Sequence, residues 1–199
     1  MLGRYEEKRR LPGHADRAAK ALRLAETQGY SLLVFVKDVD RQPGTKKSAT
    51  ERRKKLRDMH AEIQAGFDDV KGADHVPRVK ATPCRMIEAW ALGDPNAIKK
   101  VGAKRTSQAA VPARPEEVWG KEQQPSSDHP KCLLRRALGK DVNALVLEEL
   151  AREASPATLR ATCPESFAPF ADEVLEAINA IAMARAATRA HRGRLTRTQ

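Results

Sequence analysis

The chain has 199 residues, 41% of them hydrophobic and 4% aromatic, which suits one domain with an aliphatic core and an extension. Its three widely spaced cysteines, Cys84, Cys132 and Cys163, form no C-x-x-C pair and argue against a disulfide scaffold or a zinc knuckle. The net charge of +11 favours a polyanionic partner such as nucleic acid. The sequence has no run of 18 apolar residues, the length that would predict a membrane span, so we expect a cytoplasmic protein.

The first elements are a helix and a strand. Residues 1–13 are polar and are interpreted as a leader. Residues 14–29 carry alanine and leucine at helical spacing and end at a glycine, which predicts a helix. The continuous apolar run 31–37 predicts a strand that is covered on both faces, as in a parallel sheet.

A second helix and a second strand follow. The loop 41–48 leads into a helix that Ser48 or Thr50 can cap, and residues 75–82 predict a strand with a proline near its start. The apolar residues of the helix recur at helical spacing and predict its buried face: Leu56, Met59, Ile63 and Phe67.

Two short helices complete the first half of the chain. Residues 84–93 predict one helix, and a second begins at Asp94, an N-cap residue followed by proline. The alternation of helices and strands is typical of an α/β fold, so residues 14–102 are expected to form a small, mostly parallel sheet flanked by helices.

The second half is predicted to be a helical extension. Residues 103–128 are interpreted as a loop with one short turn, residues 129–184 as helices, and residues 185–199 as a basic tail without regular structure. The last helix is predicted to bury a stripe formed by Phe167, Phe170, Val174, Ile178 and Ile181.

Two carboxylates follow the first strand. Asp38 and Asp40 are two residues apart, so their side chains are expected on the same side. Adjacent carboxylates repel each other unless a cation lies between them, and such oxygen ligands prefer Mg²⁺ or Mn²⁺. An ordinary solvated turn after a strand is the alternative interpretation.

A third acid and several cations could join this pair. Glu88 lies within the apolar segment "RMIEAWALG", and a metal shared with Asp38 and Asp40 is one partner that could hold it there. The start of the helix in "HPKCLLRRALG" can hold a phosphate, or the helix is simply basic and solvated. The candidate contacts to nucleic-acid phosphates are Lys46, Lys47, Arg52, Lys131, Arg135 and Arg136.

The segments "FVKDVDR", "ATPCRMIEAWALGDPNAI" and "HPKCLLRRALG" together resemble the DUF4276 family of bacterial proteins, which is related to Toprim domains. The resemblance covers about residues 14–180. It implies a Toprim- or Rossmann-like sheet and a Mg²⁺ or Mn²⁺ site in which Asp38, Asp40 and Glu88 are both metal ligands and catalytic residues. It also implies nuclease activity, and a role in phage defence beside an ATPase partner.

The chain departs from this family in one respect. Toprim domains begin with a strand that ends in a glutamate, whereas Glu6 and Glu7 lie in the polar stretch "YEEKRR". The leading hypothesis is a Mg²⁺-dependent nuclease-like protein. The missing glutamate favours the alternative, a non-catalytic nucleic-acid-binding or protein-interaction module on the same fold. A third hypothesis is a phosphotransferase or phosphatase with Asp38 as its nucleophile.

Overall fold

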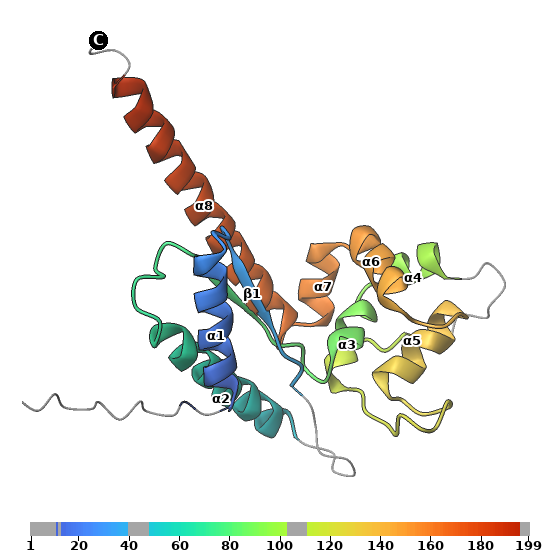
Figure 1. Ribbon diagram of the computed structural model, residues 1–199. Coiled ribbons are helices and arrows are strands. Elements are labelled where there is room, and N and C mark those ends of the chain that lie inside the picture. Colours follow the sequence, from blue (N-terminus) through green and yellow to red (C-terminus); the bar gives the residue numbers. More distant parts are fainter. Residues whose placement is uncertain (1–10, 12, 40–47, 103–110, 196–199) are drawn as a thin grey trace, which may run out of the picture.

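The computed structural model describes residues 11, 13–39, 48–102 and 111–195. Helices dominate this part of the chain, and the strands alternate with helices only in its first half (Figure 1). The elements are, in order, α1 (Gly13–Thr27), β1 (Leu33–Val36), α2 (Ala49–Asp68), β2 (Arg78–Ala81), α3 (Ile87–Ala91), α4 (Pro95–Val101), the 3₁₀ helix η1 (Pro115–Glu117), α5 (Pro130–Leu138), α6 (Ala144–Glu153), α7 (Pro156–Thr162) and α8 (Phe167–Leu195).

The two described strands form a parallel sheet. β1 pairs with β2 in a register that places Val34 beside Val79 and Val36 beside Ala81. Beyond the strands, a further parallel bridge joins Val39 to Cys84. The protein is therefore a mixed α/β fold with a small parallel sheet, as expected in outline from the sequence.

One face of this sheet is covered by α1 and α2, whose side chains form the first core cluster. The predicted face of α2 is confirmed, because Ile63 and Phe67 are fully buried and Leu56 and Met59 nearly so. Phe35 of β1 meets the Phe67 ring edge-on at 6.2 Å between centroids. Burying each of these large side chains stabilises the fold by about 1.5–3 kcal/mol.

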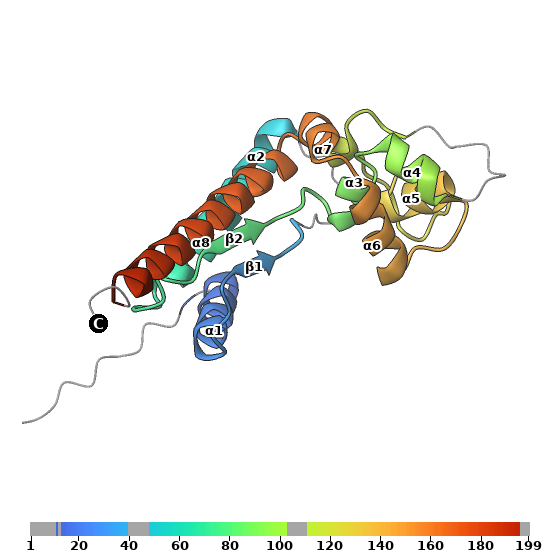
Figure 2. The same ribbon diagram turned by 90° about the horizontal axis from the view of Figure 1, so that it is seen from above.

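The other face of β1 is exposed, which corrects the prediction that this strand is covered on both sides. Val34 is 40% and Val36 59% exposed, whereas Val79 and Ala81 beside them on β2 are buried. The cause is the position of α8, which packs on β2 and does not extend over β1 (Figure 2).

A second core cluster joins α4, α5 and α6. Ile98 of α4 packs with Leu134 and Leu138 of α5 and with Leu150 of α6. Asp94 is the N-cap of α4 as predicted, since its Oδ1 accepts the N–H groups of the next turn. α3 and α4 thus contact the helical extension, although the sequence placed them with the sheet.

Helix α8 spans 29 residues and continues beyond the predicted extension. Residues 185–195 belong to this helix, so the prediction that they lack regular structure is wrong; alanine and arginine, which are abundant there, are strong helix formers. The stripe prediction is wrong at Ile178, which is 50% exposed, because the second half of α8 extends past the sheet (Figures 1 and 2). Within the described residues, no helix combines the length and apolar character that a bilayer span requires.

Candidate functional site at the carboxyl ends of the strands

The predicted acids lie where the two parallel strands end. Asp38 is half-buried and follows β1 in register with Val34 and Val36, so alternation places it on the open face of the strand. Glu88 is half-buried in the first turn of α3, four residues after Cys84. Asp40 lies outside the described residues. In open α/β sheets, this end of the strands is the usual position of a ligand.

Lys131 at the start of α5 lies close enough to the two described acids for their charges to act on it. Its ammonium bonds Glu122 Oε1 at 3.0 Å, and this bond is the main cause of its raised pKa. The charges of Glu88 and Asp38 raise the pKa further, while burial opposes them. Three residues from three distant segments of the chain therefore share one electrostatic neighbourhood.

Arg85 contributes a cation that the sequence analysis missed. Its side chain is 4% exposed, and its guanidinium carbon lies 5.3 Å from the centre of the Trp119 ring. Its φ angle is +78°, the only positive φ of a non-glycine residue in the described part of the chain. Such a conformation costs of order 1–3 kcal/mol and is concentrated at functional sites. No local motif in "TPCRMI" predicts it.

His129 packs against Trp119, the ring that Arg85 also contacts. It is 3% exposed, and its ring centroid lies 5.3 Å from that of Trp119. Burial lowers its pKa although Glu122 and Glu88 oppose this effect, which favours the neutral imidazole. Its Nδ1 atom has no hydrogen-bond partner within the described residues. His129 is also the N-cap of α5, where the first N–H groups of a helix are available to an anion.

The remaining predicted phosphate contacts differ in their surroundings. The Arg52 side chain is 10% exposed and ion-paired with Glu117 at 3.6 Å and Glu165 at 3.4 Å, so its guanidinium serves a structural contact instead of the predicted phosphate contact. Arg135 is exposed and pairs with Asp141 at 3.2 Å.

Arg136 binds the carbonyl oxygens of Pro125 and Ser127 and braces the loop before α5. This use of its guanidinium makes a structural role the simpler interpretation. Lys46 and Lys47 lie outside the described residues.

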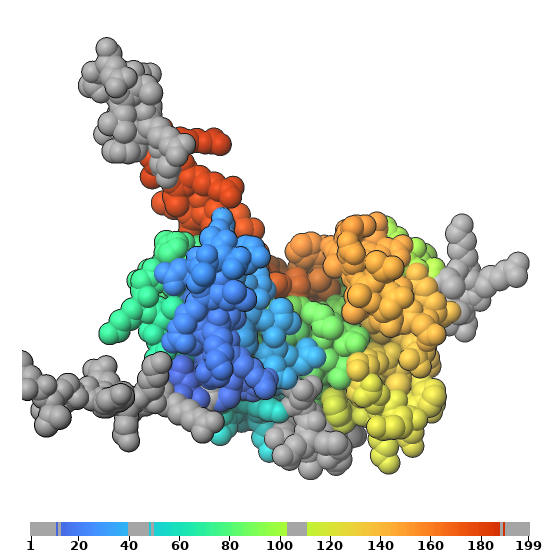
Figure 3. Space-filling model, in the orientation of Figure 1, coloured from blue at the N-terminus to red at the C-terminus, as the bar shows by residue number. Residues whose placement is uncertain are grey.

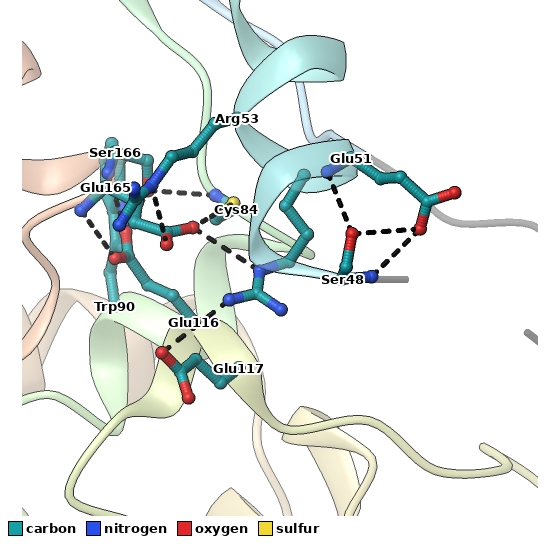
Figure 4. Close-up of polar contacts among 10 residues, drawn as sticks. Ser48, Glu51, Arg53, Cys84, Trp90, Glu116, Glu117, Glu165 and Ser166 are labelled. Carbon is teal, nitrogen blue, oxygen red and sulfur yellow. Dashed lines mark hydrogen bonds and ion pairs between the residues drawn. The ribbon is translucent and has the colours of Figure 1, made fainter. Parts of the chain in front are cut away.

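A buried network of hydrogen bonds joins Cys84 and Trp90 to the start of α8 (Figure 4). Ser166 Oγ accepts the backbone N–H of Cys84 at 2.9 Å and the indole N–H of Trp90 at 2.8 Å, and it donates to Glu116. Glu116 also accepts the backbone N–H groups of Glu165 and Ser166, each at 2.8 Å. The network therefore ties the end of β2 and α3 to the start of α8.

The donor chemistry of the site is compatible with magnesium. The described residues supply two carboxylates, Asp38 and Glu88, and no group of three or more potential metal ligands gathers among them. Mg²⁺ commonly uses only one or two protein carboxylates and keeps water or substrate phosphate in its other positions. Asp38 and Glu88 are therefore the described residues that would hold such an ion.

No protein-family model, curated protein or solved structure matches this chain. Its function is accordingly inferred from the chemistry of the residues at this site.

Proposed function

We propose that this chain is a metal-dependent, nuclease-like phosphodiesterase that acts on nucleic acid. The observation that carries the proposal is the position of two carboxylates, Asp38 directly after β1 and Glu88 in the first turn of α3, beyond the carboxyl ends of a parallel sheet. Carboxylates beside a lysine and a helix start suit a phosphodiester, whose charge needs cations and N–H donors. The net charge of +11 supports a polyanionic substrate.

Each residue has a role in this proposal. Asp38 and Glu88, with Asp40, would hold Mg²⁺ or Mn²⁺, and Glu88 could instead orient a water molecule. A bound ion of this kind neutralises charge on the phosphate and positions the nucleophile. Lys131 would contact a non-bridging phosphate oxygen and keep the substrate aligned with the acids. An ATPase partner, as the family resemblance implies, remains part of the proposal.

A non-catalytic nucleic-acid-binding module is the second candidate. It is favoured by the cations near the acids. The charges of Asp38 and Glu88 stabilise the Lys131 ammonium, so these acids can be balanced without a metal ion. The buried Arg85 precedes Glu88 by three residues. Such a site could bind a phosphate without hydrolysing it.

Cleavage and binding assays on the full chain separate the two candidates. We expect Mg²⁺- or Mn²⁺-dependent cleavage of DNA or RNA, which Asp38→Asn and Glu88→Gln each reduce at least about a hundredfold. The matched control is Asp74→Asn, whose carboxylate is 89% exposed and should leave cleavage unchanged. Undiminished cleavage by Asp38→Asn would exclude the proposed site. Binding that Lys131→Ala weakens, without cleavage under any metal, would support the binding module.

A further inference from the structure

The two outer edges of the sheet are treated differently by the fold. On β2, the outward-pointing N–H of Lys80 donates to the Glu173 carboxylate of α8 at 2.7 Å. This edge is thereby capped by a side chain and covered by a helix. The outer edge of β1 has no equivalent cap within the described residues.

The backbone bonds of β1 identify its unpaired groups. The N–H groups of Leu33 and Lys37 donate toward β2, to Pro77 and Ala81, each at 2.9 Å. Successive N–H groups of a strand point to opposite sides, so those of Val34 and Val36 point away from β2. In the described part of the chain, neither group has a backbone hydrogen bond on that side. What fits such an edge is another extended strand.

The side chains at this edge are apolar and accessible. Val34 is 40% and Val36 59% exposed. Residues 30–36 contain no charge, although 32% of the chain is charged. Natural edge strands are normally protected by lysine, proline or a bulge, and residues 33–36 carry none of these. β1 lies on the near side of the ribbon in Figure 1, and Figure 3 shows this blue segment at the molecular surface.

We propose that β1 pairs with β1 of a second copy of this chain in antiparallel orientation. The resulting sheet would have the order β2-β1-β1-β2 and would satisfy the free N–H and C=O groups of both copies. The described residues form a sheet of two strands, and this pairing would extend it to four. The proposal concerns assembly and does not depend on the proposed function.

A second copy fits this edge because an antiparallel pairing is self-complementary: the outward N–H and C=O groups of Val34 meet those of Val36 in the other copy. Two chains of charge +11 repel each other, and this repulsion is weakest where an uncharged segment such as residues 30–36 forms the contact. With Val34 of each copy opposite Val36 of the other, each Lys37 lies opposite Leu33 of the other copy. The two Lys37 side chains are then offset by about 14 Å along the strands, beyond the screening length of about 8 Å. A parallel pairing in register would place them side by side.

The test combines sedimentation with hydrogen exchange on the full-length chain. We expect a monomer–dimer equilibrium in analytical ultracentrifugation, and exchange protection of residues 33–37 that increases with protein concentration. Val36→Lys should weaken dimerisation at least tenfold, because it places a charge against the partner. The matched control is Leu145→Lys on α6, where the side chain is 73% exposed and the substitution should have no effect.

Each other outcome overturns the proposal. A monomer at every concentration with rapid exchange at Val34 and Val36 shows an unoccupied edge. Protection that does not depend on concentration shows that another segment of the same chain covers β1. A dimer that Val36→Lys leaves intact, but that Met183→Lys disrupts, assigns the interface to α8. Should Val36→Lys fail to fold, Val36→Thr, which keeps the shape of the side chain, and the concentration dependence of exchange still decide the question.

Discussion

The carboxylate of Glu116 accepts the backbone N–H of Ser166 at 2.8 Å, although 50 residues separate the two. It also accepts the N–H of Glu165, so a side chain of the 3₁₀ helix caps the start of α8. The positive end of the helix dipole favours a carboxylate at this position, while burial raises the pKa of Glu116. The start of the long helix is thus held by a residue of η1, far from it in the sequence.

Ser166 is the centre of this network, and its substitution should be costly. Ser166→Ala leaves the buried N–H groups of Cys84 and Trp90 without their acceptor, so we expect a loss of about 2–4 kcal/mol in the free energy of unfolding. Ser155→Ala, which removes only the N-cap bond of α7, should cost about 1 kcal/mol. Urea denaturation measures both, and equal losses would contradict a special role for Ser166.

The backbone of Arg85 predicts an unusual order of stability. Its φ of +78° favours glycine, so Arg85→Gly should be more stable than Arg85→Ala by about 1 kcal/mol. At Arg57, in the interior of α2, the order should reverse, because glycine is about 1 kcal/mol less favourable than alanine in a helix. Thermal unfolding of the four variants tests this. The same order at both positions would rule out the left-handed conformation of Arg85.

His60 should make the protein sensitive to acid. Its imidazole bonds Thr82, and burial is the main cause that lowers its pKa below the ordinary 6.5. The unfolded chain therefore binds a proton more readily than the folded one, so stability is lost as the pH falls from about 6.5 through the lowered pKa. Denaturation measured from about pH 7.5 to about pH 5 spans the ordinary histidine pKa. Over this range the free energy of unfolding should fall less steeply for His60→Gln than for the wild type. His75→Gln, which alters an exposed imidazole, should retain the wild-type decline.

The buried thiols should be unreactive in the folded protein. Burial, with a contribution from the charge of Glu116, raises the pKa of both Cys84 and Cys163 to about 12. Both thiols are then protonated at neutral pH, and the thiolate is the reactive form. In a Cys132→Ser background, intact-mass measurements after a pulse of N-ethylmaleimide should show modification only after unfolding in urea. Rapid labelling of the native protein would show that one of these sites opens.

Local features of this protein were predictable from the sequence. The apolar face of α2, the Asp94 cap and the Ser48 cap each depend on residues within a few positions of one another. Periodicity and capping act over one or two helical turns, so a short stretch of sequence contains all the information they need.

Only the tertiary structure decided which faces and charges meet. It left Val36 exposed on a strand that looked buried, joined Arg52 to Glu165 rather than to solvent, and brought Lys131 into the field of Asp38 and Glu88. It also placed Glu116 at the start of α8. These contacts join residues dozens of positions apart, and their formation depends on how whole helices pack on the sheet. No local pattern encodes that packing, because the same amphipathic faces can be paired in several ways.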